Sequence, residues 1–276
     1  MNEVELTPRP VREARGVVAG YDCLPWRLLG GGNLNDTYLL HSEHSKLIVR
    51  ARKSELPVDV EAYLAELVEV VGSVLPFLQF RYRTVTEEIT IIEKLSAAKV
   101  RVPVIRAYGE DWLAYTFVPG TPLATLLQSS PCVIQISHFL HEVAMANAAG
   151  LVCGDRWGGN EIVDQLGNVN LIDFDIEWFG PDLELLKNLD VAVAVAGILR
   201  NATFEESCSH VEEALRAVAS VHAYDLAVVA MILDRYADFY DNDTVMLRLS
   251  LAGPSNLYRR AVSRLRSFAQ SIAWGS

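Results

Sequence analysis

Three polar side chains in one short stretch have the types and spacing that phosphoryl transfer requires. Asp155 follows a glycine, Asn160 comes five residues later, and Asp173 lies thirteen residues beyond Asn160 at the end of an apolar pattern. Transfer of a phosphoryl group to a hydroxyl needs a carboxylate that orients and deprotonates the attacking group. It also needs oxygen ligands for the magnesium that bridges the ATP phosphates. The Asp-x4-Asn spacing fits a loop in which one side chain faces the acceptor and the other faces the metal.

Polar residues of these types also occur in ordinary turns, where their side chains bond to the nearby backbone. Asp155 or Asn160 taken alone would fit such a turn. The apolar pattern Val169 to Ile172 predicts a strand that brings Asp173 to the same cleft, and this joint occurrence favours an active site. Asp175 is left open between a further carboxylate of that site and a surface position.

Length and composition bound the class of protein. A chain of 276 residues is long enough for one large domain or for two lobes around a shared cleft, and 51% hydrophobic residues provide a substantial core. The net charge of −11 and the pI near 5.0 predict a surface that repels nucleic acid and anionic membranes and tolerates cationic small molecules. The alternative is that this acidity serves only solubility.

The cysteines and the first residues indicate the compartment. The four cysteines are far apart and include no Cys-x-x-Cys pair, so neither a disulfide framework nor a zinc site is indicated. Residues 1–5 lack the pattern of a signal peptide, and no stretch approaches the roughly 18 apolar residues of a membrane span. We therefore expect a cytoplasmic protein that binds a small-molecule substrate, with no nucleic acid and no membrane as partner.

Periodicity and turn residues predict the order of helices and strands. Strands are expected over 26–29, 37–40, 47–51 and 112–118, and helices over 58–75, 86–98, 132–149, 185–200, 205–221, 224–240 and 255–273. The glycine cluster 30–32 between the first two strands predicts a hairpin with a flexible tip. The stiff connector Pro119–Pro122 divides the chain into an N-terminal nucleotide-binding lobe, 1–118, and a C-terminal catalytic and substrate-binding lobe, 119–276.

With these residues in place, the order of motifs resembles the aminoglycoside phosphotransferase and choline kinase-like family of small-molecule kinases. The resemblance covers roughly residues 24–200, and its most specific part is the segment 154–173, which is similar to the family's His-Gly-Asp-x4-Asn followed by Ile-Asp-Phe. Phe117–Leu123 resembles the family's hinge, and Gly31–Asn35 resembles its Gly-Gly-x-x-Asn loop. The resemblance implies an α+β, bilobal protein-kinase-like fold, with a small antiparallel β-sheet N-lobe and a larger, mostly helical C-lobe.

The resemblance also implies roles in the central segment. Asp155 would be the catalytic carboxylate, and Asn160 and Asp173 would be the magnesium ligands. Asp190 would accept hydrogen bonds from the backbone of the catalytic loop, although a plain helix N-cap would look the same in sequence. Cys153 stands where the family usually has histidine, and we expect it to pack as a small hydrophobe rather than to act as a nucleophile.

Nucleotide binding is assigned to the glycine loop and the hinge. Gly31 and Gly32 would let backbone N–H groups approach the phosphates, because no Cβ stands in the way. Asn35 would contact a phosphate or simply close the turn. The adenine of ATP would bond to the backbone between Thr116 and Val118.

A kinase also needs a cation on its third strand, held by a helix carboxylate. Arg50 occupies the position that resembles this cation, with Arg52 and Lys53 as rivals; all three would otherwise be solvated edge charges. Glu88 is the expected partner of Arg50, and Glu66 on the preceding helix is the competitor.

The helix over 58–75 is a departure from the family's pattern, because it lengthens the span between the third strand and the helix that carries Glu88. It could form a wall for the substrate, a subunit contact or mere decoration of the small lobe. The sequence leaves these alternatives open.

Together these features predict an ATP- and Mg2+-dependent phosphotransferase that transfers the γ-phosphate to a hydroxyl of a small molecule. The acidic surface and the resemblance favour an amine-bearing alcohol such as an aminoglycoside, an amino sugar or choline. A neutral sugar, a nucleoside or an amino-alcohol metabolite fits nearly as well.

Two other classes were weighed against this prediction. A nucleotide-binding pseudokinase with a scaffold or sensor role is favoured by Cys153 and Arg50, but the three intact polar residues of the central segment argue against it. A protein kinase is disfavoured because Asp175, and not glycine, follows Phe174, and because no Ala-Pro-Glu segment is present.

Overall fold

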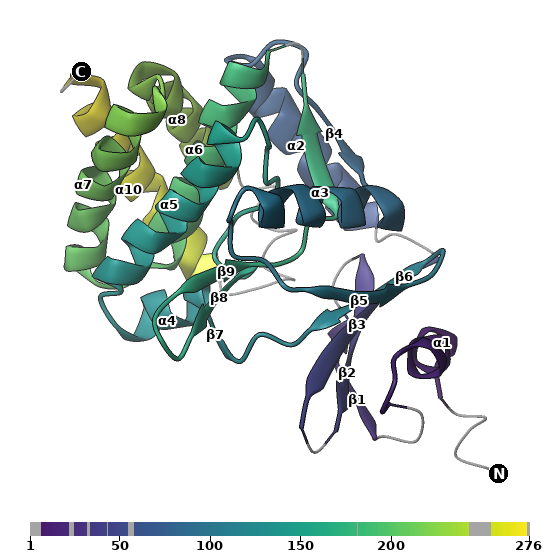
Figure 1. The fold of residues 1–276 in the computed structure, drawn as a ribbon. Helices are drawn as coiled ribbons and strands as arrows, with labels where there is room; N and C mark the ends of the chain where they lie inside the picture. The colour runs from purple at the N-terminus through teal and green to yellow at the C-terminus, as the bar shows by residue number, and fades with distance from the viewer. Residues whose placement is uncertain are drawn as a thin grey trace.

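The computed structural model describes residues 7–21, 25–31, 34–42, 44–54, 58–180, 182–242 and 255–274. The helices are α1 (Arg9–Val17), α2 (Val58–Gly72), α3 (Val85–Ala97), α4 (Leu123–Ser129), α5 (Val133–Ala148), α6 (Leu183–Asn201), α7 (Glu205–His222), α8 (Leu226–Asp241) and α10 (Ser255–Trp274). The strands are β1 (Trp26–Gly31), β2 (Asn35–His41), β3 (Lys46–Arg52), β4 (Gln79–Tyr82), β5 (Ile105–Tyr108), β6 (Trp112–Thr116), β7 (Gly120–Pro122), β8 (Glu161–Asp164), β9 (Val169–Leu171) and β10 (Ile176–Phe179). A small sheet with α1 lies beside a larger group of helices (Figure 1).

The main sheet has the antiparallel order β1-β2-β3-β6-β5, and its two faces have different partners. Leu40 and Val49 belong to the face that α1 covers through Val11. Successive side chains of a strand point to opposite faces, so Ile48 and Arg50 lie on the other face, where Ile48 joins the main core. The strand alternation therefore directs Arg50 away from α1 and toward the rest of the chain.

Helix α3 brings a carboxylate to that face of the sheet. Its N-terminus has a capping box, in which the Thr84 side chain accepts from the Glu87 N–H and the Glu87 carboxylate accepts from the Thr84 N–H. Ile89, Ile92 and other apolar residues bury the inner side of the helix. Glu88, in the first turn, is buried with them and comes within reach of the sheet.

Helix α2 packs against α8 in the helical part, although it precedes the sheet strands β5 and β6 in sequence. Tyr63 of α2 contacts Phe239 of α8 edge to face, with ring centroids 5.1 Å apart. The next strand, β4, pairs antiparallel with β10, so that Tyr82 lies opposite Ile176. Mere decoration of the small lobe is therefore the wrong interpretation of this helix. The domain boundary at 118 stays a prediction.

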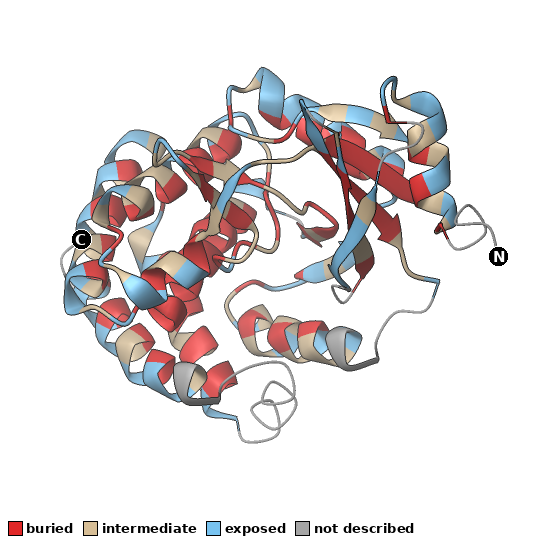
Figure 2. Cartoon of the chain, turned by 90° about the horizontal axis from the view of Figure 1, so that it is seen from below, coloured by how far each residue is buried: buried red, intermediate tan, exposed pale blue. Residues whose placement is uncertain are grey.

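Helix α6 is the centre of the helical part. Every residue from Asn188 to Asn201 is buried, because α4, α5, α7, α8 and α10 all contact this helix. Figure 2 shows buried residues along the inner sides of the surrounding helices. A helix that is apolar nearly all round belongs in a core, so the apolar run 191–199 is the buried helix expected from sequence.

The predicted elements match the observed ones closely. The seven expected helices and the strand at 112–118 have observed bounds within three residues of those predicted. The short strands β4, β5, β7, β8 and β10 and the short helix α4 were not predicted. Among the described residues, no helix combines the length and the apolar character needed to cross a membrane.

Candidate active site

The loop that carries Asp155 is anchored by Asp190, which is fully buried in the interior of α6. The Asp190 carboxylate accepts from the N–H groups of Cys153 at 2.8 Å and Gly154 at 3.0 Å, and from the Asn147 side chain at 2.9 Å. The N-cap alternative for Asp190 is wrong, because Asp182 caps α6. Asp190 therefore fixes the start of the loop, as the resemblance implies.

Gly154 is required by the path of the chain immediately before Asp155. Its φ is +87°, and a Cβ at this position would collide with the carbonyl oxygen of Ile176. The loop therefore passes directly over the start of β10 without a side chain between them.

Cys153 is buried beneath this loop, where the family usually has histidine. Burial and the nearby Asp190 raise the pKa of its thiol well above the ordinary value. A thiol that stays protonated is a poor nucleophile, so packing is the role that its surroundings support.

Asp155 is half-buried and has a pKa suited to proton transfer. Burial, with a smaller contribution from the neighbouring Asp173, raises the pKa of its carboxyl to about 6 against the opposing effects of Arg156 and Arg200. Within the described part of the chain, no hydrogen bond occupies the Asp155 carboxylate. A carboxylate with a pKa near neutrality can accept a proton from a bound hydroxyl.

Asn160 and Asp173 converge on Asp155. The Asn160 side-chain N–H donates to the backbone oxygen of Asp155 at 2.9 Å. The backbone oxygen of Asn160 accepts from the Ile172 N–H at 2.9 Å. Asp173 has a left-handed backbone with φ of +62°, a strained conformation for this residue type that is found at functional sites. The three residues predicted from their spacing thus occupy one site.

These oxygens suit a magnesium ion. The Asn160 amide directs an N–H to the Asp155 backbone oxygen, which leaves its own oxygen for a cation. Asp173 follows Ile172, whose N–H bonds to the Asn160 backbone oxygen, and its carboxylate acts on the pKa of Asp155. Asp175 adds a second carboxyl close to Asp173. Amide and carboxylate oxygens are the ligands that Mg2+ prefers, so the donor set fits this metal.

Arg50 connects the sheet to this site through three carboxylates. It forms an ion pair with Glu88, and its Nη2 lies 2.6 Å from Asp173 Oδ1 and 3.0 Å from Asp175 Oδ2. Asn35 donates to the same Asp175 oxygen at 2.8 Å. The pairing of Arg50 with Glu88 is therefore present in the structure, and Asn35 bonds across to Asp175 instead of closing its own turn.

Two alternatives for these residues are wrong. Asp175 is 6% exposed and Arg50 is 5% exposed, so neither is a solvated surface charge. Of the rival cations, Arg52 lies beside two of the same carboxylates, 3.7 Å from Glu88 and 3.8 Å from Asp175, and donates to the Arg83 backbone oxygen at 2.6 Å. Lys53 lies 3.7 Å from Asp36.

The two aspartates respond oppositely to their surroundings. Burial acts to raise the pKa of Asp173, but Arg50 and a hydrogen bond from Asp175 outweigh it and lower the pKa. Burial and the charge of Asp173 raise the pKa of Asp175 well above its ordinary value. These surroundings favour the ionised form of Asp173 and the protonated form of Asp175.

Two buried arginines that sequence reasoning missed hold the segment around Asp173. Arg156 donates to the backbone oxygens of Ile172, at 2.8 Å, and of Asp173. Arg83 donates to the oxygens of Phe174 at 2.9 Å and Ile176 at 3.0 Å. Burying these backbone carbonyls requires partners, and the arginines supply them. In sequence, Arg156 stands directly after Asp155, and that position is the one available signal.

The glycine loop and the hinge are described in part. Gly31 ends β1, and Gly32 lies outside the described residues. The Thr116 N–H donates to Val104 at 2.9 Å, so Thr116 could offer adenine only its carbonyl oxygen. No backbone bond of the described residues occupies the Val118 N–H. A carbonyl and a free N–H two residues apart match the paired acceptor and donor edge of adenine.

On the other side of Asp155 the loop rests on α6 through Trp157. A Cβ at Gly197 would collide with the Trp157 backbone, and Asn201 donates to the Trp157 oxygen at 3.0 Å. The guanidinium of Arg200 lies over the Trp157 ring, 5.1 Å from its centroid. Sequence reasoning missed these residues, because nothing in the pattern of α6 distinguishes its last turn.

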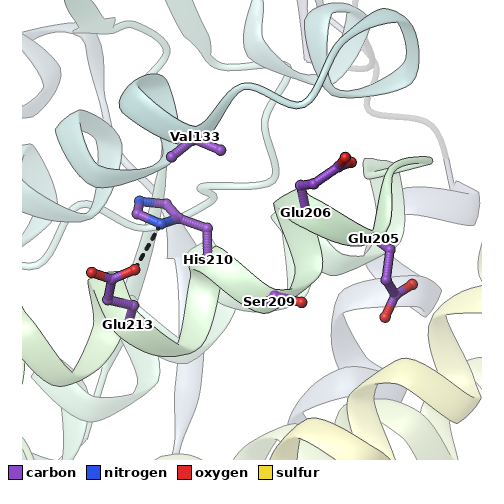
Figure 3. Close-up of a pocket in the computed structure, with 6 residues that line it drawn as sticks. All are labelled: Val133, Glu205, Glu206, Ser209, His210 and Glu213. Atoms are coloured by element: carbon purple, nitrogen blue, oxygen red, sulfur yellow. Dashed lines mark ion pairs between the residues drawn. The ribbon is translucent and has the colours of Figure 1, made fainter.

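A separate surface pocket lies between α5 and α7 (Figure 3). It is lined by Val133, Glu205, Glu206, Ser209, His210 and Glu213. His210 pairs with Glu213 at 3.2 Å and bonds to Ser137 at 2.8 Å, so its ring is fixed by the helices themselves. None of these residues belongs to the Asp155 site.

Comparison with known proteins identifies the fold. A protein from Ralstonia eutropha JMP134 named as a candidate aminoglycoside phosphotransferase superposes with a TM-score of 0.51 at 12% identity, over 96% of each chain. Rio2 kinase from Chaetomium thermophilum, in a complex with ADP, Mg2+ and phosphoaspartate, gives a TM-score of 0.48 at 13% identity, over 94% of this chain and 74% of its own. No family model matches the sequence, and no curated protein matches it.

The bilobal, α+β, protein-kinase-like fold implied by the resemblance is therefore confirmed. At this identity the structural likeness establishes the fold alone. Function has to be argued from the site.

Proposed function

We propose that this chain is an ATP- and Mg2+-dependent phosphotransferase that transfers the γ-phosphate to a hydroxyl of a small molecule. The observation that carries the proposal is the convergence of Asp155, Asn160 and Asp173 beside a buried Arg50–Glu88 pair. The protein-kinase-like fold supports it, because this fold places a nucleotide between a small sheet and a helical lobe.

Each residue has a distinct part in the proposed reaction. The Asp155 carboxylate accepts a hydrogen bond from the acceptor hydroxyl and takes its proton as that oxygen attacks the γ-phosphorus, while the bond from this phosphorus to the β,γ-bridging oxygen breaks and ADP leaves. Asn160, Asp173 and Asp175 would hold magnesium, which neutralises phosphate charge when it is bound. Arg50 supports the phosphates from the sheet side. The protein therefore contributes mainly orientation and charge stabilisation.

The acceptor class follows from analogy and charge. An amine-bearing alcohol remains the proposal that the net charge of −11 favours, because a cationic substrate is attracted to an acidic protein. The absence of a glycine after Phe174 favours a small molecule over a protein acceptor.

The test is Mg2+-ATP turnover by the purified protein across aminoglycosides, amino sugars, choline, neutral sugars and nucleosides. We expect ADP release that depends on the acceptor and falls about 10²- to 10⁴-fold in kcat in Asp155→Asn, because general base catalysis is lost. Asp164→Asn, in the turn between β8 and β9, is the matched control and should leave turnover unchanged.

Two results would contradict the proposal in different ways. Saturable nucleotide binding without turnover, unchanged by Asp155→Asn, would favour a nucleotide-binding pseudokinase. Failure to bind any nucleotide would exclude both the phosphotransferase and the pseudokinase.

A further inference from the structure

Arg200 is a buried cation with no carboxylate within ion-pair distance among the described residues, and the carboxylate it acts on from farther away is that of Asp155. It is 8% exposed and lies in the last turn of α6. The other deeply buried arginines have carboxylates nearby: Arg50 has three, Arg83 lies 3.7 Å from Glu177, and Arg156 lies 3.4 Å from Glu161. Burial of an unpaired charge is costly, so its retention requires an explanation.

The hydrogen bonds of Arg200 are long and few. Its Nη1 donates to the Tyr240 hydroxyl at 3.4 Å, and its Nη2 donates to the Trp157 backbone oxygen at 3.4 Å. A guanidinium has five N–H donors in one plane. Most of its capacity to bind an oxygen anion is therefore unused by the protein.

Aromatic rings hold the guanidinium in place. Its central carbon lies 5.1 Å from the ring centroid of Trp157 and 5.3 Å from that of Tyr258. Stacking on aromatic faces is favourable for arginine and occupies the faces of the cation rather than its N–H edge. The rings thus orient the edge that could bind a carboxylate or a phosphate through two hydrogen bonds.

The position of Arg200 relates this edge to the reacting group. Trp157, on which Arg200 stacks, is two residues after Asp155 and is 38% exposed, so solvent reaches this side of the loop. Arg200 acts on Asp155 from α6, whereas Arg50 of β3 contacts Asp173 and Asp175. An anion at Arg200 would therefore belong to the acceptor rather than to the nucleotide.

We propose that Arg200 binds an anionic group of the phosphoryl acceptor, so that the substrate is an alcohol that also carries a carboxylate or a phosphate. This inference rests on the proposed function and specifies its substrate class. An amine elsewhere on the acceptor is compatible with it, whereas a purely cationic amino alcohol would leave Arg200 unpaired beside a second cation.

The test uses four three-carbon alcohols that differ only in the end group: glycerate, glycerol 3-phosphate, glycerol and 3-amino-1,2-propanediol. Binding to the full chain, saturated with Mg2+ and a non-hydrolysable ATP analogue, is measured by calorimetry. We expect at least tenfold tighter binding of glycerate or glycerol 3-phosphate than of the other two. The comparison of these two anions distinguishes a carboxylate from a phosphate ligand.

Arg200→Met should abolish this preference and leave the affinity for the ATP analogue unchanged. Arg200→Lys keeps the charge but not the planar fork, so a several-fold loss is expected, and it serves as the second variant if Arg200→Met does not fold. Arg216→Met, which removes a cation that pairs with Glu212 on α7, is the matched control and should keep the preference.

The preference ratio separates recognition from a structural role, because a structural defect would weaken all four ligands alike. An equal loss of affinity for all four alcohols in Arg200→Met would overturn the inference. Two results with the wild-type chain would also overturn it: tighter binding of glycerol or of 3-amino-1,2-propanediol than of the anions, or no binding of either anion. In each of those cases nucleotide binding would persist. If nucleotide binding itself fails, the proposed function fails, and this inference with it.

Discussion

Two buried arginines flank the Asp155 site, and the protein surrounds them in opposite ways. Arg50, on the sheet side, contacts Glu88, Asp173 and Asp175. Arg200, on the helical side, has aromatic neighbours and no carboxylate within ion-pair distance among the described residues. The difference suggests that a cation whose charge is balanced inside the fold organises the site, whereas one left unbalanced is available to a ligand.

The two arginines also differ in what they connect. The partners of Arg50 come from α3 and from the segment around Asp173, which are far from β3 in sequence. Their ion pairs therefore exist only when the sheet, α3 and the helical part are assembled together. Arg200 instead lies among rings supplied by the loop after Asp155, by α8 and by α10.

The largest expected effect is a difference in stability between two matched variants. Arg50→Met would leave three carboxylates around an apolar side chain, and loss of one member of a buried network typically costs about 3–5 kcal/mol. Arg200→Met breaks no ion pair among the described residues, although it removes a charge that lowers the pKa of Asp155. It places an apolar chain between Trp157 and Tyr258, so we expect a loss of at most about 1 kcal/mol. Urea unfolding without nucleotide, at pH 7, measures both.

Equal losses in the two variants would contradict the comparison. A large loss in Arg200→Met alone would show that this arginine has an internal counter-ion. Arg216→Met on the exposed side of α7 provides the reference for removing a cation from a paired surface position.

The buried pair of Arg156 and Glu161 lies between the cases of Arg50 and Arg200. Arg156 has a carboxyl nearby, but burial favours the neutral form of that Glu161 carboxyl. Burial raises the pKa of Glu161 from 4.5 to about 7, against the opposing effects of Arg156 and the Gly158 N–H. Between these values the folded chain holds a proton that the unfolded chain has released, so stability falls as pH rises from about 4.5 to about 7. A shift of this size corresponds to roughly 3 kcal/mol.

Glu161→Gln cannot titrate, and its stability should lack this component of the pH dependence. Urea midpoints of both proteins at pH 5 and pH 8 isolate the effect, because the other buried carboxyls titrate in both. Parallel pH profiles for the wild type and Glu161→Gln would show that Glu161 stays ionised against Arg156.

Within the Arg50 network, the two aspartates should respond unequally to the same change. Asp173→Asn removes an ionised partner of Arg50 and should cost about 2 kcal/mol, in the range of a charged hydrogen bond. Asp175 already holds a proton, and an asparagine can still accept from Arg50 and donate to Asp173. We therefore expect Asp175→Asn to change stability by less than about 1 kcal/mol, measured by thermal unfolding without Mg2+.

The difference in stability between Asp173→Asn and Asp175→Asn should change when magnesium and nucleotide are added. Both variants lose a carboxylate that could hold the metal, so both should lose Mg2+-dependent stabilisation. A larger loss of metal-free stability in Asp175→Asn than in Asp173→Asn would contradict the assigned protonation states.

Sequence patterns predicted the features that depend on local periodicity and on motif spacing. The buried helix at 191–199 follows from a continuous apolar run, and the bounds of α3 follow from apolar residues three or four apart. The short spacing from Asp155 to Asn160 also constrains geometry strongly, and the structure brings both to Asp173. Their roles in metal binding and catalysis stay predictions.

The features that sequence did not predict depend on contacts between distant segments. The residues next to Arg83 or Arg200 in sequence do not show which side chains will surround the guanidinium group. Its environment is set by β10 or by α10, far away in the chain. The packing of α2 on α8 likewise depends on tertiary contacts. An apolar stripe on a helix predicts that this face is buried, but it does not identify the element that covers it.

The smallest expected effect concerns the helix that presents Glu88 to Arg50. Thr84→Ala removes the side chain that accepts from the Glu87 N–H, which leaves the first turn of α3 with an unpaired donor. Loss of such a cap costs about 1 kcal/mol, and Thr84→Ser should restore most of it. Because Glu88 lies in that turn, hydrogen exchange should quicken at the start of α3 in Thr84→Ala but not around Arg200. Equally faster exchange around Arg50 and around Arg200 would contradict this expectation. It would show that both arginines belong to one cooperative unfolding unit and that the Thr84 cap does not stabilise the Arg50 network separately.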